Sequence, residues 1–165
     1  HHQNMLAPKT LARAIQALDL HPLDQVLEIG TGLGYSTLLL SRLSKKLTSI
    51  EIIPDIFEQA KKNLSAFSPH NIDLILGDGA QGYFTTPAKT FDKIFVSGSY
   101  PDSIPTALIN QLNPGGKLFA FVGKTAPHEA ILLSKSSEGT LSQQSLFETV
   151  VTPLMNVPEQ NRFEL

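Results

Sequence analysis

The stretch that decides the fold of this chain is Val26-Leu27-Glu28-Ile29-Gly30-Thr31-Gly32-Leu33-Gly34-Tyr35-Ser36. It starts as a short apolar strand, breaks at three alternate glycines and leads into a helix predicted over residues 37–43. A strand, a glycine-rich turn and a helix N-terminus together form a binding site for a nucleotide-like ligand. Glycine suits such a turn because it permits a positive φ and lets ligand atoms approach the backbone without a Cβ in the way.

The spacing of these glycines narrows the kind of ligand. It is G-x-G-x-G, which differs from the G-x-G-x-x-G fingerprint of dinucleotide-binding domains. Glu28 precedes the first glycine, and an apolar strand followed by E/D-x-G-x-G-x-G resembles the first motif of S-adenosylmethionine (SAM) methyltransferases. The resemblance implies SAM as the cofactor, bound by Glu28, Gly30, Thr31, Gly32, Leu33 and Gly34. The alternative is an ordinary glycine-rich turn between a strand and a helix.

Composition limits the function classes. The 165 residues are 41% hydrophobic and 17% charged, as in a globular protein, and we expect one domain over residues 1–165. The formal net charge of −2 argues against a nucleic-acid or membrane-surface binder. The longest apolar run, residues 118–122, is far shorter than the roughly 20 residues of a membrane span. The chain has no cysteine, and we expect a cytoplasmic location.

Strands and helices alternate along most of the chain. Strands are predicted over residues 25–29, 47–52, 72–76, 93–96 and 117–122, helices over 10–20, 37–43, 54–67 and 105–112, and a closing hairpin over 130–134 and 145–151. This alternation predicts an α/β fold, with a parallel sheet covered by helices on both faces. With the methyltransferase resemblance it predicts a Rossmann-like, mostly parallel seven-stranded sheet of order 3-2-1-4-5-7-6.

Polar residues follow several of the predicted strands, at the sheet edge where open α/β folds bind ligands. Glu51, followed by Ile52, ends the second strand, and a carboxylate there can accept both ribose hydroxyls of an adenosine. Asp78 follows the third strand, where it can bind the adenine amino group, and Gly79 gives backbone access. Ser97 follows the fourth strand and faces the expected position of methyl transfer. The alternatives are a surface acid for Glu51, a turn aspartate for Asp78 and a loop of small polar residues for Ser97.

Three blocks of the chain carry a more specific resemblance. They are VLEIGTGLGY over residues 26–35, GDGAQGY over 77–83 and IPTALINQLNPGG over 104–116. These blocks resemble the protein-L-isoaspartate O-methyltransferase family, and Val151-Thr152-Pro153-Leu154 is similar to a V-P-L element near the family's C-terminus. The resemblance implies a SAM-dependent domain that methylates the α-carboxylate of isoaspartyl residues in damaged proteins, as a step of repair.

The chain departs from this family near its N-terminus. The family motif is T-I-S-x-P, with the serine at the reaction centre, whereas this chain has Asn4-Met5-Leu6-Ala7-Pro8. The resemblance places Met5, Leu6, Ala7 and Pro8 beside the substrate, with Leu6 at the serine position, as in a divergent bacterial branch of the family. Because leucine offers no hydrogen bond, we expect SAM binding with weak transfer to isoaspartyl peptides. The family carries several tens of residues before this motif, so we expect a fragment, a processed form or a reduced variant.

The chemistry of the acceptor decides which residues the reaction needs. A carboxylate is already a nucleophile at neutral pH, so positioning and exclusion of water suffice, and we assign no catalytic residue. A hydroxyl or amine acceptor would need a base, and none stands out. His21, His70 and His128 show no metal-ligand spacing, so no metal is expected.

Three other functions remain open alongside a carboxyl methyltransferase. One is a SAM-binding or interaction domain without catalysis, and another is a SAM enzyme with a different acceptor. The third is a nicotinamide-dependent oxidoreductase, which the glycine spacing and the lack of a Tyr-x-x-x-Lys pair disfavour.

Overall fold

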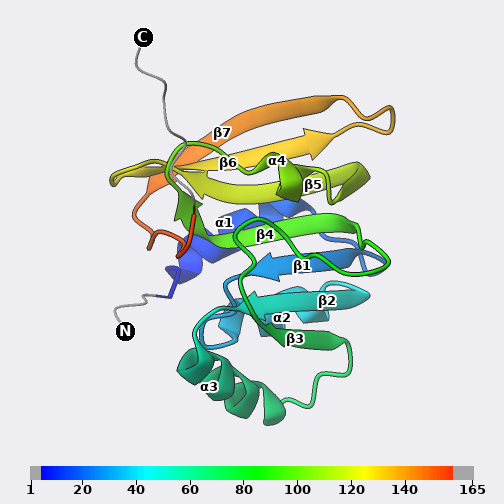
Figure 1. The fold of residues 1–165 in the computed structure, drawn as a ribbon, viewed down its shortest axis with the longest axis vertical. Coiled ribbons are helices and arrows are strands. Elements are labelled where there is room, and N and C mark those ends of the chain that lie inside the picture. The colour runs from blue at the N-terminus through cyan, green and yellow to red at the C-terminus, as the bar shows by residue number, and fades with distance from the viewer. Residues whose placement is uncertain (1–4, 158–165) are drawn as a thin grey trace.

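One seven-stranded sheet organises the computed structural model of the chain, which describes residues 5–157 (Figure 1). The elements in chain order are α1 (Pro8–Leu18), β1 (Gln25–Ile29), α2 (Tyr35–Arg42), β2 (Lys46–Glu51), α3 (Pro54–Ser65), β3 (Ile72–Leu76), β4 (Phe91–Tyr100), α4 (Thr106–Ile109), β5 (Leu112–Val122), β6 (His128–Lys135) and β7 (Leu141–Thr149). The strand order is β3-β2-β1-β4-β5-β6-β7. Strands β1 to β5 pair in parallel, and β6 and β7 pair antiparallel.

The predicted order of the last two strands, 5-7-6, is wrong, because β6 is the neighbour of β5. Its register with β5 runs from Lys117↔Ser134 to Val122↔Glu129. Only residues 123–127 join the two strands, and they contain no helix. A crossover to a more distant position needs a dozen or more residues, whereas antiparallel neighbours need only a short turn. The chain therefore forms a hairpin here, and β7 becomes the edge strand.

Several element bounds differ from those predicted. Helix α1 begins at Pro8, since proline is favoured in the first turn of a helix, and α2 begins at Tyr35, directly after Gly34. The helix predicted over residues 105–112 is only α4, because β5 already starts at Leu112, which pairs with Phe91. Strands β1 and β3 have the predicted bounds.

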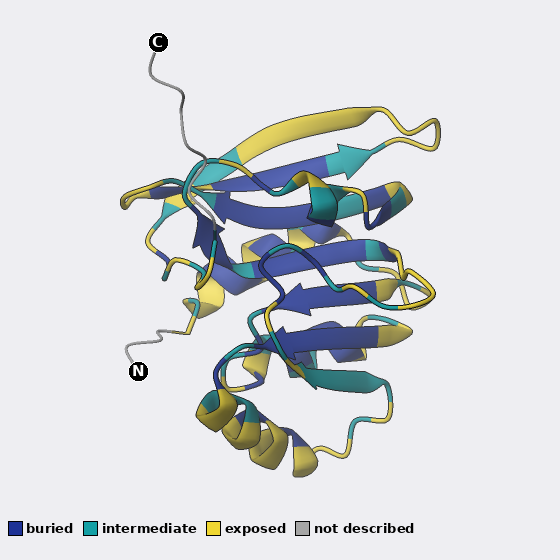
Figure 2. Cartoon of the chain, in the orientation of Figure 1, coloured by how far each residue is buried: buried dark blue, intermediate teal, exposed yellow. Residues whose placement is uncertain are grey.

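A hydrophobic core covers each face of the sheet, because successive strand residues point to opposite faces. On one face, side chains of α1 and α2 pack against the sheet in a cluster that includes Leu11, Leu18, Leu40, Val26, Phe95 and Phe119. On the other face, Leu108 of α4 joins a cluster that includes Leu27, Ile94, Tyr100 and Leu118. Figure 1 shows α1 and α2 behind the strands and α4 in front. Figure 2 shows the central strands buried and β7 largely exposed.

The chain returns after β7 to the end of β4. The backbone N–H of Ser99 donates to the carbonyl of Thr152 (3.2 Å), and the N–H of Leu154 donates to the carbonyl of Ser99 (3.0 Å). A side chain at Gly98 would meet Leu154 and the Thr152 carbonyl at about 3.0 Å, so glycine permits this close approach. The return brings residues 152–155 to the carboxyl ends of the central strands, near the start of α1 (Figure 1).

None of the helices among residues 5–157 is long and apolar enough to cross a bilayer.

Candidate functional site

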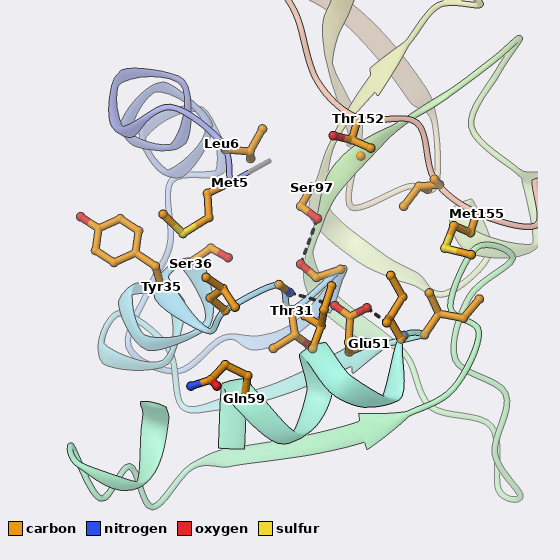
Figure 3. Close-up of a pocket in the computed structure, with 18 of the residues that line it drawn as sticks. Met5, Leu6, Thr31, Tyr35, Ser36, Glu51, Gln59, Ser97, Thr152 and Met155 are labelled. Carbon is orange, nitrogen blue, oxygen red and sulfur yellow. Dashed lines mark hydrogen bonds between the residues drawn. The ribbon is translucent and has the colours of Figure 1, made fainter. Parts of the chain in front are cut away.

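A cavity of about 480 Å³ lies at the carboxyl ends of β1, β2 and β4 (Figure 3). Its walls come from the glycine loop after β1, the end of β2 with the first turns of α3, and the end of β4. The segment before α1 and the segment that returns to β4 after β7, residues 152–155 (the return segment), complete the walls. The residues that line it are Met5, Leu6, Leu11, Gly30, Thr31, Gly32, Leu33, Tyr35, Ser36, Glu51, Ile52, Ile53, Asp55, Ile56, Gln59, Ser97, Gly98, Thr152, Pro153, Leu154 and Met155. Its size and place are those of a small-molecule site in an open α/β sheet.

The glycine loop presents bare backbone to this cavity. Gly30, Gly32 and Gly34 have φ values of 90°, 56° and 90°, in the region that glycine adopts readily. A Cβ at Gly30 would lie 2.1 Å from the hydroxyl oxygen of Ser97, and one at Gly34 would lie 3.1 Å from Leu64. A Cβ at Gly32 would meet no atom of residues 5–157 within 4 Å. The contact with Ser97 therefore excludes a side chain at Gly30, the space at Gly34 is tight, and Gly32 borders open space in the cavity.

The carboxylate of Glu51 is held in place by two backbone amides. Its Oε2 accepts a hydrogen bond from the N–H of Gly32 (2.9 Å), and its Oε1 accepts one from the N–H of Ile53 (3.0 Å). The residue is only 5% exposed and lines the cavity. Each carboxylate oxygen keeps a second lone pair, so the group can accept two neighbouring hydroxyls of a ligand such as a ribose.

A second carboxylate, Glu28, is fully buried beneath the loop. It accepts hydrogen bonds from the hydroxyls of Ser36 (2.5 Å), Thr37 (2.6 Å) and Ser49 (2.6 Å). Burial raises its pKa to about 7, although the three donors lower the pKa in part, and the charge of Glu51 adds to the increase. This cluster joins β1, α2 and β2 under the cavity floor.

The Thr31 side chain extends the same network to the cavity wall. Its hydroxyl oxygen lies 2.6 Å from that of Ser49. Because the proton of Ser49 is donated to Glu28, the proton between the two hydroxyls comes from Thr31. The glycine loop is thus tied to Glu28 by a directed chain of hydrogen bonds.

Ser97 joins the ends of β1 and β4. Its hydroxyl donates to the carbonyls of Ile29 (3.0 Å) and Gly30 (2.9 Å). Ser97 lines the cavity, but its proton is engaged by these carbonyls, and its place near methyl transfer stays a prediction.

The structure brings most of the predicted site residues to one cavity. Gly30, Thr31, Gly32, Leu33, Glu51, Ile52, Met5, Leu6 and Ser97 line it. Gly34, Ala7 and Pro8 do not, and Glu28 lies beneath it. Contacts of any of these residues with a bound molecule stay predictions.

Asp78 and Gly79 lie outside the cavity lining. Asp78 is exposed; its Oδ1 accepts the N–H of Ala80 (2.9 Å), and its Oδ2 accepts the side-chain amide of Asn156 (3.2 Å). Gly79 is buried, and a Cβ there would lie 2.9 Å from Ile29. An interaction of Asp78 with an adenine stays a prediction.

The predicted site residues do not include Leu11, Gly98 or three further groups of lining residues: Tyr35 and Ser36; Ile53, Asp55, Ile56 and Gln59; and Thr152 to Met155. The second group could have been found, because α3 starts at Pro54, three residues after Glu51, and its first turns must lie beside that carboxylate. The return of Thr152 to β4 has no local signal beyond the V-P-L-like element.

The cavity wall carries negative charge. Glu51 and Asp55 line it, and none of the lining residues within the described range 5–157 is lysine, arginine or histidine. Such a wall favours a cationic ligand, and an anionic group can be bound there only by neutral donors such as hydroxyls and backbone amides.

The fold and this cavity define a SAM-dependent methyltransferase-like domain of the Rossmann-like type. A solved methyltransferase from Thiobacillus denitrificans in complex with S-adenosyl-L-homocysteine superposes with a TM-score of 0.58 at 27% identity, over 72% of this chain and 50% of that one. A solved protein-L-isoaspartate O-methyltransferase superposes with a TM-score of 0.78 at 27% identity, over 91% of this chain and 48% of that one.

The chain belongs to the protein-L-isoaspartate(D-aspartate) O-methyltransferase family, whose model matches residues 1–159. It is 40% identical over 143 residues to the protein-L-isoaspartate O-methyltransferase of Methanococcus maripaludis, covering 85% of this chain and 65% of the relative. It is 42% identical over 126 residues to protein-L-isoaspartate O-methyltransferase 1 of Archaeoglobus fulgidus, covering 74% of this chain and 57% of the relative. The chain thus spans about 65% or less of the length of these curated relatives.

The buried Glu28 predicts a pH-dependent stability. Its pKa rises from an ordinary 4.5 to about 7 in the folded chain, so the folded state binds its proton more tightly than the unfolded state. The contribution of Glu28 to the free energy of unfolding is therefore full below pH 4.5 and is lost as the pH rises to about 7, by an amount on the order of 2–3 kcal/mol. Glu28→Gln, which cannot ionise, should remove this decline.

The measurement is urea unfolding of the parent and Glu28→Gln between pH 5 and pH 8. Other titrating groups are common to both proteins, so the difference between the two curves isolates Glu28. Parallel curves would show that Glu28 titrates alike in the folded and unfolded states.

Proposed function

We propose that this chain transfers the methyl group of SAM to the α-carboxylate of isoaspartyl residues in damaged proteins. Membership of the protein-L-isoaspartate(D-aspartate) O-methyltransferase family supports the reaction class. The observation that carries the cofactor assignment is the Glu51 carboxylate, which two backbone amides hold against the cavity beside Gly32. The cytoplasmic location stays a prediction.

The residues of the cavity fit SAM. The carboxylate of Glu51 suits the ribose hydroxyls, and the open space at Gly32 lets the cofactor approach the loop backbone. A wall with two carboxylates and, in the described part of the chain, no cationic side chain suits a positively charged sulfonium. When bound, SAM would supply an electrophilic methyl group for transfer to the acceptor carboxylate.

The chain's own residues then have two tasks. They hold the acceptor carboxylate in line with the methyl group, which by orientation alone lowers the barrier by several kcal/mol. They also exclude water, and the apolar side chains of Met5, Leu6, Leu11, Leu154 and Met155 are placed around the cavity for this. No general base is required, because a carboxylate is ionised at neutral pH.

Transfer to an isoaspartyl peptide tests the function. With labelled SAM, we expect base-labile methyl ester on an isoaspartyl peptide and none on the same peptide with a normal aspartate. Leu6 offers no hydrogen bond at a position where the family motif has serine, so a low rate is expected. Binding of SAM without transfer to this peptide would overturn the proposed reaction and favour a SAM-binding domain or a different acceptor.

Glu51→Ala tests the ribose assignment. Loss of a charged hydrogen-bond acceptor weakens the binding free energy of the ligand by roughly 1.5–3 kcal/mol. The affinity for SAM in calorimetry should therefore fall about tenfold or more. Glu58→Ala, which removes an exposed carboxylate from the outer side of α3, is the control and should bind SAM as the parent does. Circular dichroism should confirm that both variants are folded. Parental affinity in Glu51→Ala would contradict the assignment.

Gly32→Val tests the glycine loop. The added Cβ meets no atom of the described residues, but the side chain occupies cavity space and a φ of 56° disfavours a β-branched residue. SAM binding should therefore be abolished in a protein that still folds. Gly139→Val is a matched control, since Gly139 also has a positive φ (90°) and open space but lies in the turn between β6 and β7. Calorimetry should detect binding in the control alone; binding in both would refute the assignment.

A further inference from the structure

The hydroxyl groups of the cavity differ in whether their protons are free. Five lining residues carry a hydroxyl: Thr31, Tyr35, Ser36, Ser97 and Thr152. The proton of Thr31 goes to Ser49, that of Ser36 to Glu28, and that of Ser97 to two backbone carbonyls. Each of these three groups is occupied with holding the site together.

Thr152 is different, because its backbone is fixed while its hydroxyl is not engaged. Its carbonyl accepts the N–H of Ser99 (3.2 Å), and Leu154 donates to the Ser99 carbonyl (3.0 Å), so the residue is anchored to the end of β4. Its side chain is half-buried at the cavity wall, and its hydroxyl makes no hydrogen bond with any residue in the range 5–157. A positioned hydroxyl with a free proton is a ready donor to a ligand.

The location of Thr152 suits the acceptor rather than the cofactor. In Figure 3 it lies across the cavity from Glu51, beyond Ser97, with its hydroxyl directed to the side where Leu6 lies. Tyr35, the other lining residue with an unengaged hydroxyl in the described chain, is 50% exposed, and Figure 3 shows its hydroxyl pointing away from the cavity.

An acceptor carboxylate depends on such a donor. No cationic side chain lines the cavity within the described chain, so its charge must be stabilised by neutral donors. Leu6, which packs against the cluster of α1 and the sheet, supplies none. A buried carboxylate without a donor would lose much of its binding free energy to desolvation.

We propose that Thr152 is the residue that positions the acceptor: its hydroxyl donates a hydrogen bond to the substrate carboxylate and supplies on the return segment the donor that Leu6 does not. This inference rests on the proposed function and names the residue through which the cavity recognises a carboxylate.

Thr152→Val tests this role, since valine keeps the shape and removes only the hydroxyl. The dissociation constant of an isoaspartyl peptide, measured by fluorescence anisotropy with S-adenosylhomocysteine present, and the KM for methyl transfer should both rise about tenfold or more. The affinity for SAM in calorimetry should not change. Thr152→Ser should behave as the parent, and so should the control Thr149→Val, which alters a half-buried threonine outside the cavity.

A second variant pair tests whether the donor can move across the cavity. Leu6→Ser, which adds a hydroxyl to the cavity wall, should restore peptide affinity in the Thr152→Val background. Thr152→Ala, which also lacks the hydroxyl, replaces Thr152→Val if the latter does not fold.

The outcomes separate this inference from the proposed function. A parent chain that binds SAM but neither binds nor methylates the isoaspartyl peptide overturns both. A parent that methylates the peptide, with unchanged peptide affinity and KM in the hydroxyl-free variants, overturns the role of Thr152 alone. Equal losses of SAM and peptide affinity in Thr152→Val would likewise overturn it, because they indicate a general disturbance of the cavity.

Discussion

The burial of Glu28 is the constraint on which the site depends. A carboxylate with no solvent exposure must be matched by donors or protonated, and here three hydroxyls from α2 and β2 surround it. These contacts fix the start of α2 against the first two strands, and through Ser49 they also fix Thr31 of the glycine loop. The loop conformation therefore rests on a polar cluster below it, while the upper side of the loop is left for a ligand.

Glu51 extends this arrangement to the cavity itself. Its carboxylate holds the N–H of Gly32 on one side and the N–H of Ile53 on the other, so the loop and the entry to α3 share one acceptor. The two buried carboxylates have different tasks that follow from their surroundings. Glu28 is enclosed by protein donors, whereas Glu51 keeps lone pairs directed to the cavity.

Local sequence patterns were sufficient to predict several parts of the fold and of the site. The bounds of β1 and β3, the glycine loop after β1 and the place of Glu51 at the end of β2 follow from hydrophobic runs and from the residues that stop them. Local patterns did not predict the position of Asp78 correctly relative to the cavity. Like Glu51, Asp78 lies at the carboxyl end of a strand, but it is outside the cavity lining and accepts hydrogen bonds from Ala80 and Asn156. The sequence predicts that Asp78 lies at the carboxyl edge of the sheet, but it does not predict the direction of the loop after β3.

The sequence by itself determined the alternation of strands and helices, the glycine loop and the class of fold, because these depend on side-chain periodicity and on residues close together in the chain. Only the tertiary structure decided that β6 lies beside β5. It also decided that β7 ends at the carboxyl edge of the sheet, where Thr152 accepts a hydrogen bond from Ser99. The strand order depends on the length of the turn over residues 123–127, and the cavity wall depends on hydrogen bonds between residues more than 50 positions apart. No local pattern specifies contacts of that range, since they form only when the whole sheet has assembled.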